Sequence, residues 1–375
     1  MKIAIDMTGT NFMSGTKTYN LNFCEHLTKI KIKQEIFIFI CKNYKKYLPN
    51  PNNKNIKYIV KPNILSITWI RMIWMQFLFP FELMNLDINK LYSPMNFVPI
   101  FIRIFRIKSV LTIHSNLPWV NFSKMPGNYF RKFIIKILMR ISVSICDDLI
   151  VNSFFAKKEL IKFLKLKRKK IHVIYLGVDK KYKEKKKNRN FVKNFNYKRY
   201  ILSVLSCVRY HNILNLIKAF EILKKQNKTD LKLVLVLQIL DKKYFLEIKE
   251  YINENNLEEQ ILIYHDLETK YLVNLYKYSS LYAFTSYNEV FGLTSLEAMS
   301  QGCPVIISRK SALEEINGKA AKYFNPDNID DISKVMHRAL FQKNLRNILK
   351  KRGKSHIKKF DWNKTVNKTI EVVLG

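Results

Sequence analysis

The first half of the chain alternates between short apolar runs and longer segments of mixed polarity. Apolar runs of this length, bounded by polar residues, are typical of strands that are buried on both faces of a parallel sheet. In the segments Thr18–Lys29 and Tyr129–Ser142, apolar residues recur with the period of a helix. The strands that we predict in this half are Lys2–Asp6, Ile36–Ile40, Ile56–Val60, Ile88–Tyr92, Ser109–Ile113, Leu149–Asn152 and Ile171–Tyr175.

The same alternation starts again after a lysine-rich run, residues 180–199, which contains few apolar side chains. Alternating strands and helices imply right-handed parallel crossovers, so each half is predicted to form a doubly wound α/β sheet. The strands predicted in the second half are Tyr200–Val204, Leu231–Leu237, Ile261–Tyr264, Leu281–Phe284 and Val305–Ser308.

Two similar Rossmann-like domains are therefore predicted, and the length of 375 residues agrees, because single cores rarely grow this large. We place an N-terminal domain at residues 1–180, a linker at 181–198 and a C-terminal domain at 199–355. A helical segment is predicted over residues 356–375. Ligands of open α/β sheets bind beyond the carboxyl ends of the strands, so we expect the site in a cleft between two facing domains.

The stretch between the last two predicted strands carries the clearest chemical signal. A helix pattern begins near Phe291 and stops at Gly302, where a glycine commonly ends a helix. Gly292 stands at the helix N terminus, where backbone N–H groups and the helix dipole favour a bound anion. Glu289 and Glu297 would repel a phosphate there unless they accept hydrogen bonds from hydroxyl groups of the same ligand. A sugar nucleotide has this combination of phosphates and hydroxyls.

This stretch resembles the signature of the group 1 glycosyltransferases, also called glycosyltransferase family 4. Members are retaining enzymes with the two-domain GT-B fold, and we expect both properties here. Similar residues occur over nearly the whole length, including Arg71-x2-Trp74-x-Gln76-x3-Pro80, Leu111-Thr112-Ile113-His114-Ser115 and Phe360-x-Trp362. The signature itself reads Glu289-x-Phe291-Gly292-x4-Glu297-Ala298-Met299-x2-Gly302-x-Pro304-Val305-Ile306.

The resemblance implies a role for each residue of the signature. Glu297 would accept hydrogen bonds from the ribose hydroxyls of the donor, and Glu289 would lie beside the donor sugar. Backbone N–H groups would hold sugar or phosphate oxygens. The residues that would supply these N–H groups are Val290, Phe291, Gly292 and Leu293.

Other parts of the resemblance imply groups around the diphosphate. Arg209 and His211 fall where members carry basic residues, and a cation there offsets the charge that develops as the nucleoside diphosphate leaves. His114 would face the donor sugar or the acceptor. No metal and no cofactor are expected, and the leaving phosphate would deprotonate the acceptor. The residues that would border acceptor and phosphate from the first domain are Ser14, Gly15 and Thr16.

The chain departs from the family pattern beside the predicted diphosphate site. His211 replaces the usual lysine, and the charge of a histidine near pH 7 depends on its partner. Leu205-Ser206-Cys207 stands where members often have a glycine. These departures leave open a related protein that has lost activity and only binds a glycan or a partner.

The net charge of +37, from 66 basic and 29 acidic residues, should attract anionic partners. Nucleic acid, an anionic membrane and a phosphorylated substrate are all compatible with it. The lysines spread over both halves, which counts against a charge-driven nucleic-acid-binding protein. Basic and apolar residues alternate in Tyr129–Ser142, as in helices that lie on anionic membranes, although a packed helix with a basic edge explains the pattern equally well.

The most apolar segment, Leu65–Leu83, reaches the length of a membrane span. Arg71, Gln76, Pro80 and Glu82 interrupt it, so we expect a packed helix, with a membrane-contacting surface helix as the alternative. The five cysteines are scattered and lack C-x-x-C spacing, which favours a reducing compartment. The chain has no phosphate-binding G-x-x-x-x-G-K-[ST], dinucleotide-binding G-x-G-x-x-G or G-x-S-x-G motif.

We therefore predict a retaining hexosyltransferase that moves a sugar from a UDP- or GDP-sugar to a hydroxyl of a growing glycan. The bacterial setting of many relatives suggests a lipid-linked acceptor in the synthesis of a lipopolysaccharide or capsule. The expected location is cytoplasmic, peripheral on the inner face of the cytoplasmic membrane. Nucleic acid is not expected as a partner.

Overall fold

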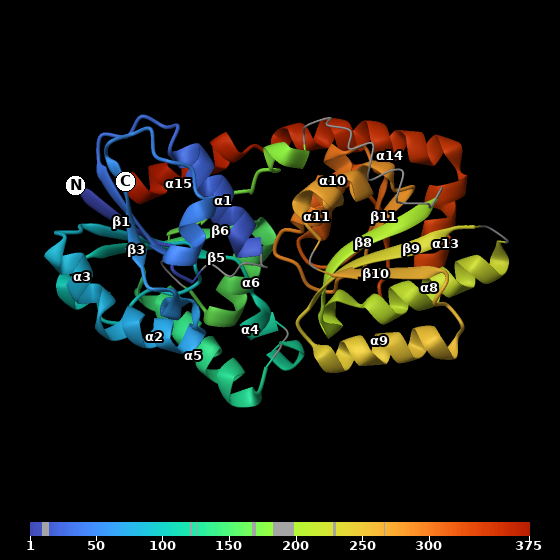
Figure 1. Cartoon of the computed structure of the whole chain (residues 1–375), viewed down its shortest axis with the longest axis horizontal. Helices are drawn as coiled ribbons and strands as arrows, with labels where there is room; N and C mark the ends of the chain where they lie inside the picture. Colours follow the sequence, from blue (N-terminus) through green and yellow to red (C-terminus); the bar gives the residue numbers. More distant parts are fainter. Residues whose placement is uncertain are drawn as a thin grey trace. The chain divides into compact units, whose positions relative to one another are not determined.

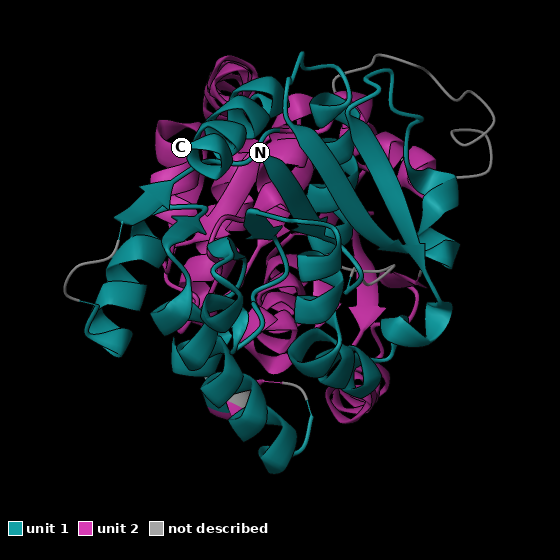
Figure 2. Ribbon diagram, turned by 90° about the vertical axis from the view of Figure 1, so that its left-hand side faces the viewer, with its two compact units in different colours: residues 1–122, 127–177, 361–375 teal, residues 123–126, 178–360 magenta. Residues whose placement is uncertain are grey.

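The computed structural model describes residues 1–9, 15–120, 122–125, 127–166, 170–182, 199–227, 230–265 and 267–375 (Figure 1). They form two compact units, which Figure 2 shows in different colours. Unit 1 comprises residues 1–122, 127–177 and 361–375, and unit 2 comprises 123–126 and 178–360. Of the predicted linker, only residues 181 and 182 lie within the described parts of the chain.

Unit 1 is built on a parallel sheet of seven strands in the order β3-β2-β1-β4-β5-β6-β7. All seven strands predicted in this half are present, with small differences at their ends. Their bounds are β1 Lys2–Asp6, β2 Glu35–Cys41, β3 Ile56–Lys61, β4 Lys90–Ser93, β5 Lys108–Ile113, β6 Asp148–Val151 and β7 Lys170–Val173. The helices are α1 Gly15–Leu27, α2 Thr68–Phe77, α3 Phe79–Asn85, α4 Leu117–Val120, α5 Tyr129–Ile145, α6 Phe154–Leu164 and α15 Trp362–Leu374.

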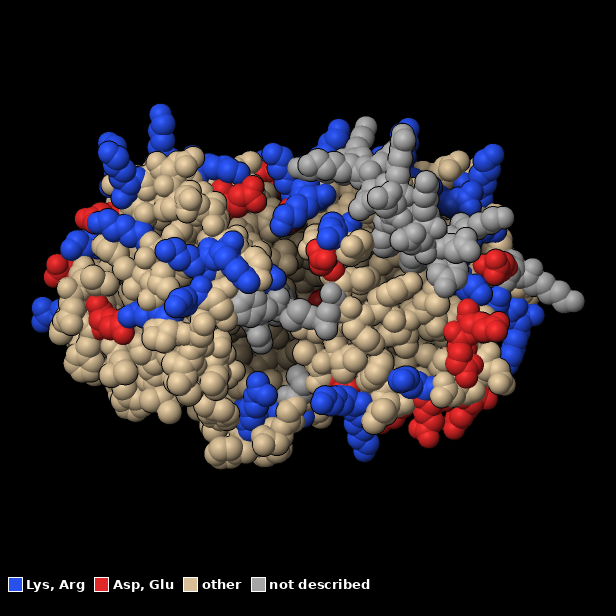
Figure 3. Space-filling view, viewed as in Figure 1, with Lys and Arg blue, Asp and Glu red and all other residues tan. Residues whose placement is uncertain are grey.

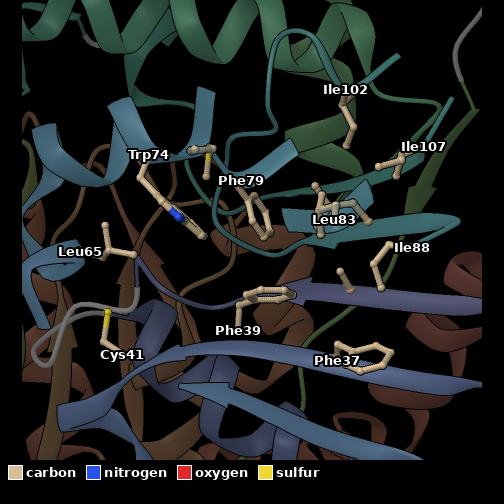
Figure 4. Packing of buried hydrophobic residues seen from close by; sticks show 13 residues of the cluster. Phe37, Phe39, Cys41, Leu65, Trp74, Phe79, Leu83, Ile88, Ile102 and Ile107 are labelled. Carbon is tan, nitrogen blue, oxygen red and sulfur yellow. The ribbon is translucent and has the colours of Figure 1, made fainter. Parts of the chain in front are cut away.

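The apolar segment around α2 is two helices and not one. The break falls at Leu78, and Pro80 stands in the first turn of α3. Proline is tolerated there because an N–H group in the first turn has no partner within the helix. In the core of unit 1, Trp74 stacks on Phe79 with ring centroids 4.4 Å apart, and Phe79 meets the edge of Phe39 from β2 (Figure 4). None of the helices in the described residues combines the length and hydropathy that crossing a bilayer requires.

Arg71 of α2 is buried and anchors the end of β1. Its Nη2 donates to Asp6 Oδ2 at 2.7 Å and its Nε donates to Thr8 Oγ1 at 3.0 Å. Asp6 is completely buried. Gly9 lies against this guanidinium, since a Cβ built there would stand 2.5 Å from Arg71 Cζ. A buried ion pair therefore holds the loop that leaves the first strand.

The last helix of the chain completes unit 1. The ring of Trp362 in α15 contacts Tyr19 of α1 at a centroid distance of 5.6 Å, and Thr365 Oγ1 donates to Tyr175 O at 2.7 Å. A Cβ on Gly177 would lie 2.3 Å from the backbone nitrogen of Trp362, so only glycine fits at this approach.

Unit 2 is built on a parallel sheet of six strands in the order β10-β9-β8-β11-β12-β13. The five strands predicted in the second half are present. The bounds are β8 Tyr200–Cys207, β9 Lys232–Ile239, β10 Ile261–His265, β11 Leu281–Phe284, β12 Val305–Ser308 and β13 Lys322–Phe324. The helices are α8 Ile213–Gln226, α9 Lys242–Glu254, α10 Thr269–Tyr278, α11 Leu293–Ser300, α12 Leu313–Asn317, α13 Ile329–Phe341 and α14 Lys343–His356.

Candidate active site

Two connections meet at the carboxyl edge of the sheet in unit 2. β8 and β11 are neighbours although β9 and β10 lie between them in sequence, so the strand order reverses here, which is where open α/β sheets bind ligands. The β11–α11 loop is bonded to the short helix η6, Arg209–His211, that follows β8. Tyr287 N donates to Tyr210 O at 2.8 Å, and Thr285 Oγ1 donates to His211 O at 2.8 Å. The signature residues thus lie on a connected set of loops.

Gly292 sets the start of α11. Its φ of +85° is in the left-handed region, and an added Cβ would lie 2.7 Å from Leu313 Cδ2. The helix begins at Leu293, slightly later than the sequence predicted, because the positive φ at Gly292 is not helical. Phe291 is buried and its ring contacts Phe360 at 5.9 Å, so its side chain packs while its backbone follows the predicted loop. Val290 is half-buried beside it.

His211 and Glu289 are brought into direct contact. His211 Nε2 lies 3.0 Å from Glu289 Oε1, and His211 Nδ1 lies 2.6 Å from Ser206 O. Both ring nitrogens therefore face acceptors, and both bonds form when the ring carries two protons, as an imidazolium paired with the Glu289 carboxylate. The His211 side chain is only 8% exposed and that of Glu289 20%. A buried histidine in contact with a carboxylate thus occupies the position where the family carries a lysine.

Arg209 does not join this pair. Its guanidinium forms an ion pair with Glu247 of α9 and lies over the ring of Tyr244, 5.1 Å from the centroid. The side chain is 45% exposed. The structure thus separates the two predicted diphosphate residues: His211 is buried against Glu289, and Arg209 is turned toward α9.

Glu297 is buried in α11 among tyrosines. Tyr276 of α10 donates its hydroxyl to Glu297 Oε2 at 3.1 Å, and Tyr182 also bonds to this carboxyl group. Burial raises the pKa of Glu297 from 4.5 to about 7, against the opposing effect of the Tyr276 bond. Sequence reasoning found Glu297 but missed both tyrosines, since Tyr276 reads as an ordinary apolar position, Tyr182 falls in the predicted linker, and neither belongs to the signature.

The stability of the protein should depend on pH through Glu297. Between pH 4.5 and about 7 the folded protein holds a proton here that the unfolded chain releases, so the free energy of unfolding should fall as pH rises through this window. Urea titrations at several pH values measure it, and Glu297→Gln, which cannot titrate, should flatten the dependence. An equally steep dependence in the variant would contradict this assignment.

The predicted site residues of unit 1 lie in two places. His114 follows β5, its Nδ1 accepts from Asn152 Nδ2 at 3.0 Å, and burial lowers its pKa to about 4. The ring is therefore neutral at pH 7 with its proton on Nε2, which has no well-aligned hydrogen-bond partner among the described residues. Gly15 and Thr16 open α1, and a Cβ on Gly15 would meet nothing within 4 Å. Ser14 lies outside the described residues.

The described residues contain no group of three or more His, Cys, Asp or Glu side chains placed to bind a metal ion. The prediction that the reaction needs no metal stays a prediction.

Two family models match the sequence in succession. The model described as Glycosyltransferase Family 4 matches residues 13–182, and that described as Glycosyl transferases group 1 matches residues 184–356. O-antigen chain mannosyltransferase RfbU from Salmonella typhimurium is 25% identical over 217 residues, which is 58% of this chain and 56% of that protein. The match thus spans only about half the length of this relative.

Solved structures share the fold over the full chain. Sucrose-phosphate synthase from Thermosynechococcus elongatus superposes with a TM-score of 0.76 at 16% identity, covering 99% of this chain and 98% of that one. HepE from Anabaena, in complex with UDP-glucose, gives a TM-score of 0.72 at 14% identity, covering 99% of each chain. The two consecutive family matches, together with this shared architecture, show that the chain belongs to the group 1 glycosyltransferases and has the GT-B fold.

Proposed function

We propose that the protein is a retaining hexosyltransferase that uses a UDP- or GDP-sugar to extend a lipid-linked surface glycan. The observation that carries the proposal is the contact between His211 of η6 and Glu289 of the loop that ends at Gly292. This arrangement puts a histidine, a carboxylate and a helix N terminus at one switch point of the sheet. The names of two similar proteins support the chemistry: RfbU acts on O-antigen chains, and HepE binds UDP-glucose.

The donor diphosphate binds where positive charge gathers. The first N–H groups of α11 have no partner inside the helix, and Gly292 allows a phosphate to come close to them. The His211 imidazolium offsets the charge that grows on the diphosphate as the bond to the sugar breaks. Arg209 has five N–H donors, so its pairing with Glu247 leaves some of them for phosphate oxygens.

The two carboxylates of unit 2 and His114 of unit 1 form hydrogen bonds with hydroxyl groups of the donor. Glu297 accepts from the ribose hydroxyls in its ionised form, and Glu289 lies beside the hexose. His114 offers a neutral Nε2–H donor to a sugar hydroxyl, since its pKa of about 4 keeps the ring uncharged. The acceptor hydroxyl loses its proton to the leaving phosphate on the same face, so the enzyme needs no separate base.

Nucleotide binding tests the proposal directly. UDP or GDP at a hundred times its dissociation constant should stabilise the folded protein by about 2.7 kcal/mol. Glu297→Gln keeps the volume of the side chain and a hydrogen bond from Tyr276, but it should weaken binding of the nucleotide at least tenfold, since bonds to a charged acceptor are worth about 1.5–3 kcal/mol. Thermal shift and calorimetry measure both effects.

A panel of UDP- and GDP-sugars then tests turnover. Slow donor hydrolysis, or transfer to a lipid-linked glycan with retention at the anomeric carbon, is the expected result. Failure to bind any nucleotide would overturn the proposal. Tight nucleotide binding without turnover on any glycan acceptor would instead favour a binding protein that has lost activity, which the histidine at position 211 first suggested.

A lipid-linked acceptor needs an enzyme that reaches the membrane. We place the protein on the inner face of the cytoplasmic membrane as a peripheral protein, where nucleotide sugars are available.

A further inference from the structure

Exposed apolar side chains are concentrated in unit 1. Among the described residues, 24 large hydrophobic side chains are exposed, and 20 of them belong to unit 1. Single exposed apolar residues are normal on any soluble protein, but a contiguous group of them marks an interaction surface.

Helix α2 has apolar side chains on its exposed face as well as on its buried face. Trp69, Ile73 and Phe77 are spaced by four residues, so they form one stripe along the helix, and they are 44%, 62% and 61% exposed. The opposite face carries Met72 and Met75, which are buried. A helix with apolar residues on both sides normally has partners on both sides.

Neighbouring elements extend the stripe. The ring of Phe81 in α3 contacts Phe105 of the short helix η3, Ile102–Phe105, at a centroid distance of 5.2 Å. Gln76 of α2 accepts from the backbone of Ile100 at 2.7 Å, which fixes the approach to η3 beside α2. Figure 3 shows a broad surface with few charged side chains over the region of α2 and α3. We define the apolar patch as Trp69, Ile73, Phe77, Phe81, Phe101 and Ile104.

The segment from residue 88 to the end of α5, which contains Phe101 and Ile104 of the patch, is basic. Residues 88–146 contain nine lysines and arginines and no aspartate or glutamate. They include α5, which is tied to the same loop because Val98 N donates to Ser142 Oγ at 3.2 Å. On α5, Arg131 and Arg140 are exposed beside aromatic residues, of which Phe130 is 67% exposed. Apolar and aromatic side chains next to cations are the composition that binds anionic lipid surfaces.

We propose that the apolar patch and α5 together form a docking surface for an anionic lipid bilayer. The patch enters the boundary between headgroups and acyl chains, and the cations of α5 contact the headgroup phosphates. The purpose of this surface rests on the proposed function, because docking would bring unit 1 to a lipid-linked acceptor. The binding itself is independent of catalysis.

A bilayer fits the surface better than a second copy of the chain. A symmetric dimer through this face would place the cations of α5 from both copies near each other, and the sequence between Ile88 and Cys146 offers no acid to compensate them. The same shortage requires any protein partner to be acidic, whereas an anionic membrane supplies the negative charge and the apolar layer together.

Vesicle flotation tests the proposal. The full chain should float with phosphatidylglycerol vesicles at low salt, bind neutral phosphatidylcholine vesicles less, and keep part of its binding in high salt through the apolar contacts. Ile73→Ser with Phe77→Ser should reduce binding at least tenfold. The matched control is Leu246→Ser with Ile348→Ser, which removes two side chains of unit 2 that are 65% and 44% exposed and should change binding less than twofold.

A second pair of variants tests the contribution of positive charge to membrane binding. Arg131→Gln with Arg140→Gln should weaken binding to anionic vesicles and reduce its salt dependence, whereas Lys343→Gln with Lys351→Gln on α14 should not. Equal flotation of the Ile73/Phe77 variant and its control, no flotation at all, or loss of a dimer in the variant on sedimentation would overturn the proposal. Thermal shift with UDP and GDP on the same variants separates this outcome from failure of the proposed function, because none of these side chains belongs to the nucleotide site.

Discussion

Glu289→Gln should lower kcat/KM by about 10²–10³-fold, the usual loss when one electrostatic contact to a reacting group is removed. The amide keeps the shape of the side chain, but it cannot present a negative charge to His211 or to the donor sugar. Nucleotide binding should change much less than turnover, because the proposed function assigns Glu289 to the sugar and not to the nucleoside. Initial rates with a fixed donor and acceptor, together with calorimetry, measure the two effects separately.

Glu314→Gln is the control for this result, since Glu314 is an exposed acid of unit 2 and pairs with Arg309 on the surface. It should leave kcat/KM unchanged. His211→Ala should also reduce turnover, and the double variant with Glu289→Gln should lose less than the product of the two single losses, because the two groups act as a pair. Full activity of Glu289→Gln in a folded protein would remove the pair from the mechanism.

Arg71→Ala should reduce the free energy of unfolding by about 3–5 kcal/mol, as expected when one partner of a buried ion pair is removed. The reason is that Asp6, which is fully buried, would lose its counter-charge, and Thr8 would lose its donor. Urea denaturation followed by circular dichroism measures the loss.

Lys2→Ala provides the comparison, because Lys2 pairs with Asp87 on the surface, where Asp87 is 83% exposed. That variant should lose no more than about 1 kcal/mol. If both variants lost the same amount, the Asp6–Arg71 pair would not hold the first loop of unit 1 as described.

The strands of both units could be predicted because each is a short apolar run buried on both faces of its sheet, a local property of the sequence. The signature around Gly292 could be predicted because this position requires glycine. Its backbone is in the left-handed region, and a Cβ there would collide with Leu313. The similarity around Arg71 was visible in the sequence, but its physical basis was not. Only the fold brings Arg71 to Asp6, 65 residues away.

Side-chain partners from distant elements could not be predicted. Tyr276 reaches Glu297 from another helix, and Glu247 takes Arg209 away from His211, although neither residue carries a sequence pattern that marks it. The break between α2 and α3 was also missed, since apolar residues continue through Leu78 without change. In each case the contact depends on which surfaces meet after folding, and the periodicity of apolar residues along the chain carries no information about that.

The packing of α15 on α1 has a consequence for biosynthesis. Residues 178–360, nearly all of unit 2, are inserted between Gly177 and Asp361 of unit 1, so the ribosome completes unit 2 before it produces the helix that Trp362 begins. Until then the surface of α1 around Tyr19 and the backbone at Gly177 lack their partner. Domains of nascent chains generally fold in the order of synthesis. Unit 1 is therefore the first unit whose synthesis begins and the last whose folding can be completed.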